Sequence, residues 1–277
     1  MRPARESLPL RQAIALGLLQ GPTELLPVSS SAHTSLIPWL CGWSYETLPA
    51  ERRKSFEIAL HAGAGLALAV EMRHELADSV LRASRSARRD SLALSLAPPA
   101  LAGLLLRRQI ERRVGGPGSI AAALLAGAGA MALADATAPL GRRTEQAGAL
   151  DGLALGIAQA LALIPGVSRS GATLAAARAR GYAPGEAARL SWEAGLPVIV
   201  GVGLLEALRS MQRGSPAEGR ATLAAGAGAS FLSTLLAARL TRGMRSRGTS
   251  LVPFAVYRSL LAIVVVRRLR SAHNRDG

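Results

Sequence analysis

Long apolar runs alternate along this chain with short segments in which the charged residues collect. Six runs are uninterrupted, and their lengths are those that cross a hydrocarbon core of about 30 Å as helices. They lie near 56–72, 91–106, 118–136, 187–208, 221–240 and 251–267. Charges rarely enter them, as expected for membrane spans. Pro98-Pro99 fall inside the second run, where we expect a kinked helix and not a loop. The pattern predicts an all-α integral membrane protein with six transmembrane helices.

Two further apolar segments are interrupted at a polar centre. The first, Gly17–His33, reads GLLQGPTELLPVSSSAH, and the second, Gly156–Thr173, reads GIAQALALIPGVSRSGAT. Each has a Gly-x-x-Gln approach, followed by apolar residues, a proline and serines. Pro22 and Pro27 cannot sit in an uninterrupted helix, and a broken apolar segment is how membrane proteins build a site inside the bilayer. We expect each segment to form a re-entrant hairpin of two half-helices, and the two hairpins to form one site.

The order of these parts predicts an inverted-topology repeat within a single membrane domain that spans the whole chain. A hairpin that returns to its own side, followed by three spans, makes an odd number of crossings, so the second copy begins on the opposite face. The repeats cover about 1–147 and 148–277, and both termini lie on one face. The loops at 73–90 and 139–149 then share a face, opposite the loop at 107–113. Arginines flank the spans at both ends, so charge bias does not orient the chain.

The net charge of +15 comes almost entirely from arginine, since Lys54 is the only lysine. Nucleic-acid binding would want aromatic residues that stack on bases, and aromatic residues make up only 3% of this chain. Basic residues at the ends of spans, facing anionic lipid headgroups, explain the charge better. We therefore expect the lipid bilayer as a partner, and no nucleic acid. The single cysteine, Cys41, excludes an internal disulfide framework and a cysteine metal site.

Glu24 is the unusual residue of the first broken segment, because a carboxylate at membrane depth needs a cation, a metal or a proton. The apolar flanks argue against the alternative of a surface glutamate in a loop. Gln20 lies four residues earlier and hence on the same face wherever the backbone is helical. Pro22 stands between the two and weakens that argument.

Three serines and a histidine follow Pro27. One of Ser29, Ser30 and Ser31 is expected to cap the next half-helix. His33 lies three residues after Ser30 and therefore on the same side of a helical turn. A lone histidine is more often structural, but a neighbouring hydroxyl and carboxylate are the surroundings of an acid/base, so both roles stay open.

The second broken segment has the features of an anion site. Pro165-Gly166 ends one half-helix, and Ser168-Arg169-Ser170-Gly171 begins the next. The N-terminus of that half-helix presents free N–H groups, and glycine lets the backbone approach a ligand closely. Arg169 adds a two-pronged donor that suits phosphate. An arginine here could instead reach the headgroups, but the neighbouring serines and glycine favour the anion site.

Together the two segments hold a carboxylate, hydroxyls, an imidazole, an arginine and a helix N-terminus, which are the groups that phosphoryl transfer needs. We expect Arg169 and backbone amides to hold the phosphate charge and Glu24 to hold a divalent cation. Ser30 or water attacks, with His33 as the acid or base. Entry from the bilayer implies a lipid substrate that carries phosphate.

At these residues the chain resembles the bacterial undecaprenyl-diphosphatase family, also called the bacitracin-resistance phosphatases. The two main signatures of that family stand here as Gln20–His33 and Pro165–Thr173. Weaker matches extend over nearly the whole chain, at Phe56–Gly63, Ala187–Ser191 with Pro197, and Pro253–Arg258. Both main signatures, in order and in a membrane protein, make the resemblance highly specific.

The resemblance implies hydrolysis of undecaprenyl diphosphate to undecaprenyl phosphate and phosphate, which recycles the lipid carrier for peptidoglycan synthesis and confers bacitracin resistance. It also implies a divalent cation, magnesium or calcium, held by Glu24 and Gln20. It implies a homodimer in the bacterial plasma membrane with an active site that opens outward. The implied catalytic residues are Glu24, Ser30, His33 and Arg169, and the implied substrate-binding residues are Gln20, Ser29, Ser168, Ser170, Gly171 and Thr173.

Three positions depart from the family pattern without removing a catalytic group. Ala32 replaces the usual glycine before His33, and His61 stands where glutamine is common. Glu193 falls in a normally apolar stretch, so it needs a partner that the sequence does not identify.

Two other classes of function fit parts of the pattern. Type-2 phosphatidate phosphatases also carry a serine shortly before a histidine, but they need a histidine and an aspartate where this chain has Ala175 and Ala179, so we reject that class. A non-enzymatic transporter of polyprenyl phosphate or of ions also uses inverted repeats with broken helices. Release of phosphate by the purified protein distinguishes the transporter from the phosphatase.

Overall fold

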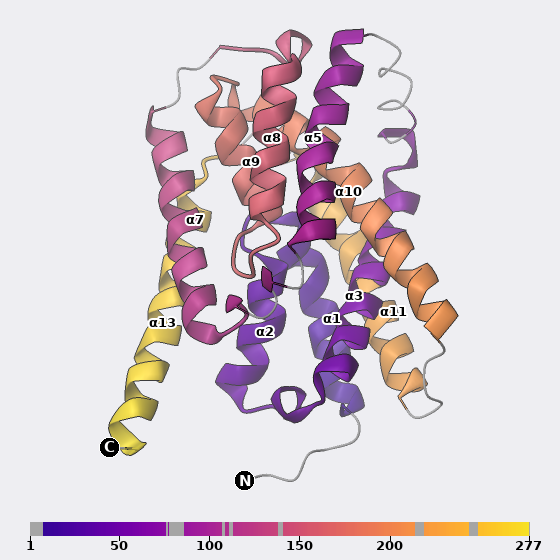
Figure 1. Cartoon of the computed structure of the whole chain (residues 1–277), viewed down its shortest axis with the longest axis vertical. Helices are drawn as coiled ribbons and strands as arrows, with labels where there is room; N and C mark the ends of the chain where they lie inside the picture. The colour runs from indigo at the N-terminus through magenta and orange to yellow at the C-terminus, as the bar shows by residue number, and fades with distance from the viewer. Residues whose placement is uncertain are drawn as a thin grey trace. The chain divides into compact units, whose positions relative to one another are not determined.

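The computed structural model describes residues 8–75, 77, 86–106, 109–110, 113–137, 141–213, 219–243 and 249–276 (Figure 1). In these ranges the regular secondary structure is helical, apart from one isolated bridge between Arg142 and Tyr182. The α-helices are α1 (Leu10–Leu25), α2 (Ser30–Cys41), α3 (Ala50–Glu71), α5 (Ser86–Leu105), α7 (Pro117–Thr137), α8 (Ala149–Leu161), α9 (Arg169–Ala179), α10 (Pro184–Arg213), α11 (Arg220–Leu240) and α13 (Val252–Asp276). Short 3-10 helices lie at η1 (Ser44–Thr47) and η2 (Thr144–Gln146).

The predicted all-α class is confirmed, and each of the predicted apolar runs falls on a helix. Among the described residues, three segments are long and apolar enough to cross a membrane: Pro117–Thr137, Pro184–Leu205 and Arg220–Leu240. These helices fit a membrane protein, whereas the six spans and the re-entrant hairpins stay predictions. Parts of the predicted loops at 73–90, 107–113 and 139–149 lie outside the described residues.

Both broken segments are pairs of helices, α1 with α2 and α8 with α9, as the prolines and serines predicted. One expectation was wrong: Pro22 lies inside α1, and the helix ends only at Leu25, before Pro27. A proline in a helix removes one backbone hydrogen bond. The Thr23 hydroxyl adds hydrogen bonds in the same turn, since it donates to the carbonyls of Leu19 and Gln20 at 2.8 and 3.2 Å.

Two compact units interleave along the chain. The first comprises Met1–Leu25, His33–His74 and Leu196–Thr241, and the second comprises Leu26–Ala32, Glu75–Gly195 and Arg242–Gly277. This division does not test the predicted repeats at 1–147 and 148–277, which stay a prediction.

In the first unit, α1 packs against α11 and α3 through small residues. A Cβ atom at Gly17 would lie 2.5 Å from the Gly226 carbonyl oxygen, so only glycine allows this approach. Ser233 of α11 donates to the Gly17 carbonyl at 2.9 Å and accepts from the Gly21 N–H at 3.2 Å. Close backbone approach with interhelical hydroxyl bonds is typical of helices packed in lipid, where apolar burial alone drives little association.

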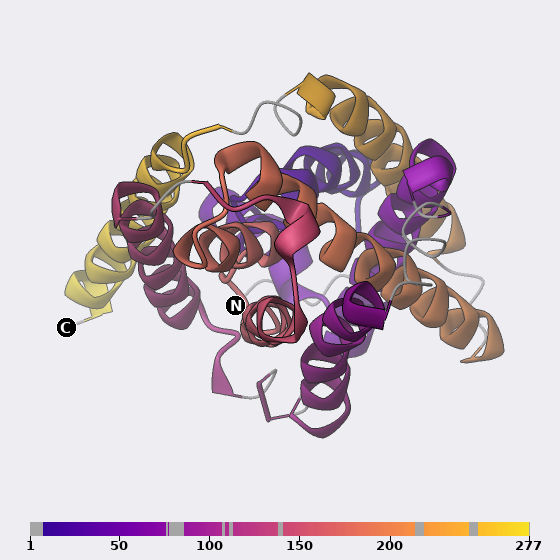
Figure 2. The ribbon, with the colours of Figure 1, turned by 90° about the horizontal axis from the view of Figure 1, so that it is seen from above.

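In the second unit, α5 packs along α8, and α13 runs beside α7 (Figures 1 and 2). Arg178 of α9 forms a buried ion pair with Asp135 of α7 at 3.0 Å. The same carboxylate accepts from the Ser250 hydroxyl and the Leu251 N–H, just before α13, at 2.6 and 3.1 Å. Asp135 therefore ties together the ends of α7, α9 and α13.

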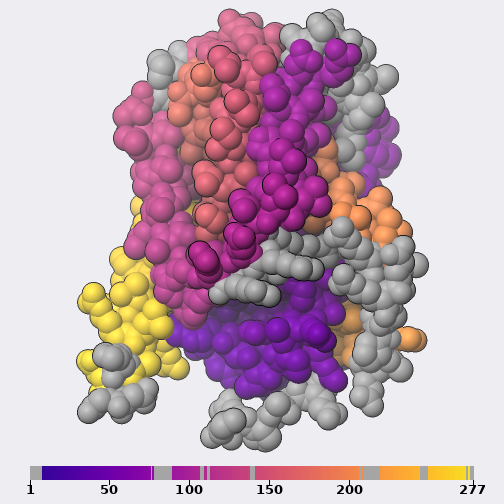
Figure 3. All heavy atoms as spheres, viewed as in Figure 1, coloured from indigo at the N-terminus to yellow at the C-terminus, as the bar shows by residue number. Residues whose placement is uncertain are grey.

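The outer surfaces of α5, α7 and α8 form one face of the second unit (Figure 3). These three helices expose large apolar side chains, among them Leu104 of α5, Leu133 of α7 and Leu150 of α8, with exposed fractions of 78, 63 and 68%. A soluble protein rarely leaves so many together in water. Contact with lipid hydrocarbon explains them.

Candidate active site

The first polar break lies between α1 and α2 and is organised by Ser29. Its hydroxyl accepts from the Ala32 N–H at 3.4 Å, so Ser29 is the serine that caps the half-helix. The hydroxyls of Ser29 and Ser31 are 3.2 Å apart. Among the described non-glycine residues, Ser29 alone has a positive φ, at 77°. Backbone strain of this kind is kept where the surrounding structure enforces it, most often at functional sites.

The second polar break, between α8 and α9, repeats this arrangement. The Ser168 hydroxyl caps α9 by accepting from the Gly171 N–H at 3.2 Å. The hydroxyls of Ser168 and Ser170 are 3.2 Å apart. Each half-helix therefore begins with a capping serine and a second serine two residues on. The residue between the two serines is Ser30 in α2 and Arg169 in α9.

Within the second unit the two breaks are joined reciprocally. Ser170 of the second break donates to the Leu26 carbonyl of the first break at 3.2 Å. Ser31 of the first break accepts from the Gly166 N–H of the second at 3.4 Å. The structure thus brings residues 26–32 together with residues 166–171, although about 140 positions separate them in the sequence. A Cβ atom at Gly171 would lie 2.9 Å from the Met131 sulfur, so this glycine also serves packing.

Arg169 is the first residue of α9 and lies against α10. A Cβ atom at Gly195 of α10 would overlap the Arg169 guanidinium. Because glycine has no side chain, the guanidinium fits against α10 at this position. Thr173, predicted to bind substrate, is fully buried. Its hydroxyl donates to the Arg169 carbonyl at 2.9 Å and lies 2.6 Å from the Ser191 hydroxyl of α10. Thr173 therefore fixes the start of α9 against α10.

The other predicted site residues, Gln20, Glu24 and His33, belong to the first unit. The same-face argument for the first two is confirmed, because the Gln20 side-chain N–H donates to the Glu24 carboxylate at 3.3 Å. Gln20 is completely buried, and its Oε1 atom has no hydrogen-bond partner among the described residues. His33 is buried in α2, three residues after Ser30.

Gln20 and Glu24 have the chemistry of a magnesium or calcium site, since both present oxygen ligands. An unpaired buried amide oxygen next to a carboxylate is a cost that a cation would remove. Among the described residues no group of three or more His, Cys, Asp or Glu side chains is placed to hold a metal. A pair of protein ligands suits Mg²⁺, which usually keeps several waters and is bound by one or two carboxylates plus substrate phosphates.

Comparison with known proteins decides the family. Residues 13–264 match the family described as bacitracin resistance protein BacA. This chain belongs to that family. It is 38% identical over 271 residues to the undecaprenyl-diphosphatase of Geobacter sulfurreducens, covering 94% of this chain and 98% of the relative. It is 36% identical over 275 residues to the undecaprenyl-diphosphatase of Thermomicrobium roseum, covering 92% of this chain and 96% of the relative. The resemblance inferred from the two signatures is confirmed.

Three residues of this BacA-family chain hold together the elements that carry the site, and the sequence did not single them out for that role. Ser191 anchors Thr173, and Arg258 reaches the main chain of both breaks. Gln159 stands in the second segment where Gln20 stands in the first. Its N–H groups donate to the carbonyls of Ser95 and Ala194, at 3.0 and 3.3 Å, and its buried Oε1 atom also has no partner among the described residues. The shared Gly-x-x-Gln approach was the available signal for Gln159.

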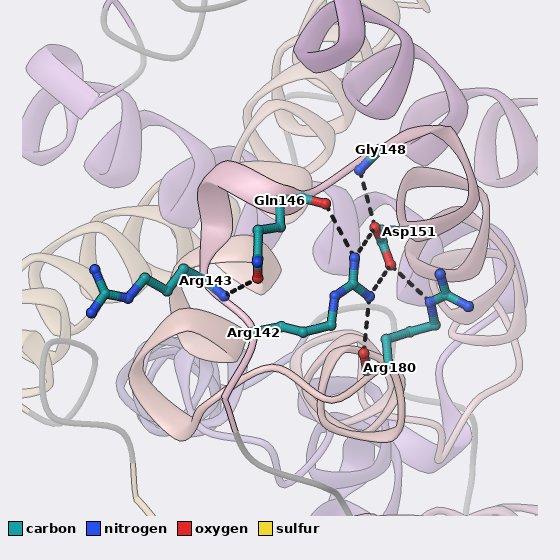
Figure 4. A network of polar contacts seen from close by, with 6 residues as sticks. All are labelled: Arg142, Arg143, Gln146, Gly148, Asp151 and Arg180. Carbon is teal, nitrogen blue, oxygen red and sulfur yellow. Dashed lines mark hydrogen bonds and ion pairs between the residues drawn. The ribbon is translucent and has the colours of Figure 1, made fainter.

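A charged cluster joins the start of α8 to the end of α9, away from the break between them (Figure 4). Asp151, in the first turn of α8, accepts from the Gly148 N–H at 3.0 Å and pairs with Arg142 at 2.9 Å and Arg180 at 2.8 Å. Arg142 also stacks on the Tyr182 ring, 4.4 Å from its centre. The hydrogen bonds that Arg142 donates to the Asp151 carboxylate raise the pKa of the Arg142 guanidinium. This cluster joins the start of α8 to the end of α9 and leaves the α9 N-terminus to the site.

Glu193, which departs from the family pattern, has its partner one helical turn earlier. Arg189 of α10 pairs with it at 3.2 Å. An i, i+4 pair of this kind balances the charge within one helix. The departure is therefore compensated locally.

Proposed function

We infer that this protein is an undecaprenyl-diphosphate phosphatase. It hydrolyses undecaprenyl diphosphate to undecaprenyl phosphate and phosphate, and so recycles the lipid carrier for peptidoglycan synthesis and confers bacitracin resistance. The relatives of matching length are named undecaprenyl-diphosphatase. The observation within the molecule that carries the proposal is the pair of serine-capped half-helix starts, joined to each other, with Arg169 at the head of one.

In the proposed site, α9 receives the terminal phosphate. The first turn of a helix presents unpaired N–H groups and a positive dipole end, which together favour an anion. Arg169 adds directed donors at the same place, and a guanidinium matches two phosphate oxygens at once. Charge that develops on the phosphoryl oxygens in the transition state is stabilised by these fixed groups.

When water attacks the terminal phosphorus, the bond to undecaprenyl phosphate breaks and phosphate is released directly. When Ser30 attacks, the same bond breaks and leaves a phosphoserine, which a water molecule then hydrolyses to free phosphate and the serine hydroxyl. His33, one turn along α2 from Ser30, takes up or returns the proton. Ser29, Ser168 and Ser170 keep the two breaks in the shape that this attack requires, through the caps and cross-links described above.

We further propose a divalent cation, magnesium or calcium, bound by Glu24 and by the Oε1 atom of Gln20, which has no hydrogen-bond partner in the part of the chain that the structure describes. Such a cation would polarise the phosphoryl oxygens and neutralise part of the diphosphate charge. The protein would act as a homodimer in the bacterial plasma membrane, with six spans, two re-entrant hairpins and an outward-facing site. The exposed leucines and apolar helices support the membrane location.

The test is release of phosphate from undecaprenyl diphosphate by the detergent-purified protein, with and without a chelator. The wild-type protein should release phosphate and lose most of that activity with the chelator, and Arg169→Ala should release far less. Equal phosphate release by the two proteins would contradict the proposed site. Lipid or ion movement into vesicles with no release of phosphate would support the transporter instead.

A further inference from the structure

Arg258 of α13 is a completely buried arginine whose described acceptors are all main-chain carbonyls. Its Nη2 donates to the Gly166 carbonyl at 2.9 Å, and its Nη1 donates to the Pro27 carbonyl at 3.5 Å. Nε and Nη2 also reach the carbonyls of Leu124 and Ala123 of α7 at 3.4 Å each. The guanidinium therefore lies between α7 and the two polar breaks.

The carbonyls of Pro27 and Gly166 occupy equivalent positions in the two breaks. Pro27 stands two residues before the capping Ser29, and Gly166 stands two residues before the capping Ser168. The two ends of one planar guanidinium thus bind corresponding carbonyls of the two halves of the site. Because the fork is rigid, it fixes the separation of the two carbonyls, which a single ammonium group on a flexible stem does not do.

The charge of Arg258 has no carboxylate partner in the part of the chain that the structure describes. Carbonyl oxygens satisfy the N–H groups but do not neutralise a buried positive charge, and such a charge is costly in a membrane protein. The guanidinium contacts the two loops that immediately precede the N-termini of α2 and α9. An anion bound at those N-termini would supply the missing countercharge.

We propose that Arg258 is a positioning residue of the phosphatase site, a role that rests on the proposed function. It holds the two breaks in one fixed relation, so that Ser30 of α2 and Arg169 of α9 act on the same diphosphate. Its charge also adds to the positive potential that attracts the diphosphate. Ser170 and Ser31 also form hydrogen bonds between the same two loops. Arg258 is the third side chain that connects them, and the only charged one among the described residues.

The kinetic test separates the fork from the charge. Arg258→Lys keeps the charge but loses the fork, so kcat should fall by about 10²-fold while KM stays near the wild-type value, because misplacement by about 1 Å costs that much. Arg258→Met loses both, so KM should rise as well. Arg267→Lys and Arg267→Met, at an exposed position of the same helix, are matched controls and should behave as wild type. Wild-type kcat in Arg258→Lys would overturn the proposal.

Hydrogen exchange measured by mass spectrometry gives a readout that does not need activity. In Arg258→Lys, amides of both 26–32 and 164–170 should exchange faster than in the wild type, whether or not those of α7 also change. Faster exchange in α7 and α13 with both breaks unchanged would show a plain packing role and would also overturn the proposal. If the wild-type protein releases no phosphate, the proposed function fails, and the exchange result still decides whether Arg258 joins the two breaks.

Discussion

Several arginines of the second unit lie near the two short helix pairs, and their surroundings distinguish their roles. Arg178 pairs with buried Asp135, Arg180 pairs with Asp151, and Arg258 binds main-chain carbonyls. These three hold helices and loops in place. Arg169 instead heads a helix beside its capping serine, where N–H groups and the helix dipole gather positive charge. At the residue scale, position and not residue type marks the arginine that we propose to bind phosphate.

Arg169→Lys should lower phosphate release by about 10²–10³-fold, or about 3–4 kcal/mol of transition-state stabilisation, because directed donors are lost while charge is kept. Arg169→Ala should lose more. The measurement is kcat/KM for undecaprenyl diphosphate in detergent. Arg180→Lys is the control, since its partly exposed ion pair can survive as a simple charge pair. Near-normal turnover in Arg169→Lys with a defect in Arg180→Lys would end the phosphate-clamp assignment.

Glu24→Gln should lose most activity, because a neutral amide cannot hold a divalent cation as a carboxylate does. Gln20→Glu should be tolerated, since it keeps an oxygen at the unpaired Oε1 position and adds a charge that strengthens a cation site. Binding of Mn²⁺, followed by electron paramagnetic resonance, should weaken only in Glu24→Gln. The metal assignment fails if Glu24→Gln keeps both wild-type turnover and sensitivity to chelator.

At the scale of elements, the two short helix pairs are held differently at their two ends. Near the breaks, serine hydroxyls and Arg258 join the loops of α1–α2 and α8–α9. At the far end of the second pair, Asp151 joins α8 to α9 through Arg142 and Arg180. We therefore expect the charged cluster to contribute to stability and the serine hydrogen bonds to shape the proposed site.

Asp151→Asn should lower the unfolding temperature, with a loss of about 1–3 kcal/mol, because a buried carboxylate that accepts three hydrogen-bonding groups is replaced by a neutral amide. At temperatures below unfolding, KM for substrate should not change. Glu145→Gln, whose side chain is 68% exposed in a pair of 3.8 Å with Arg189, is the control and should have almost no effect. A loss of activity in Asp151→Asn without a loss of thermal stability would contradict the structural role.

At the scale of the molecule, exposed leucines and the three long apolar helices found among the described residues make the lipid bilayer the natural solvent of this chain. Helix α7 is one of the three and separates the segment near Gly116 from the segment near Arg143. A helix that crosses the bilayer puts its two ends on opposite faces. The order of hairpins and spans along the chain then decides which other loops share each face.

Gly116→Cys and Arg143→Cys, each in a Cys41→Ser background, should label differently with a membrane-impermeant maleimide. Both positions are exposed, and the Arg143 side chain points away from the Asp151 cluster (Figure 4). One of them should label in intact cells and the other only after permeabilisation. Equal labelling of the two in intact cells would contradict a membrane-spanning α7 and with it the predicted order of crossings.

The sequence by itself determined the helices, the two breaks and the phosphate chemistry, because these depend on local patterns. Apolar run length, proline and capping serines act over a few residues, so Ser29 and Ser168 were recognisable as parts of half-helix starts. Only the tertiary structure decided that Pro22 stays within a helix, that Asp151 joins α8 to α9, and that Arg258 binds both breaks. The acceptors of Arg258 are main-chain carbonyls, which every residue carries. No sequence pattern marks such partners, and packing alone selects them.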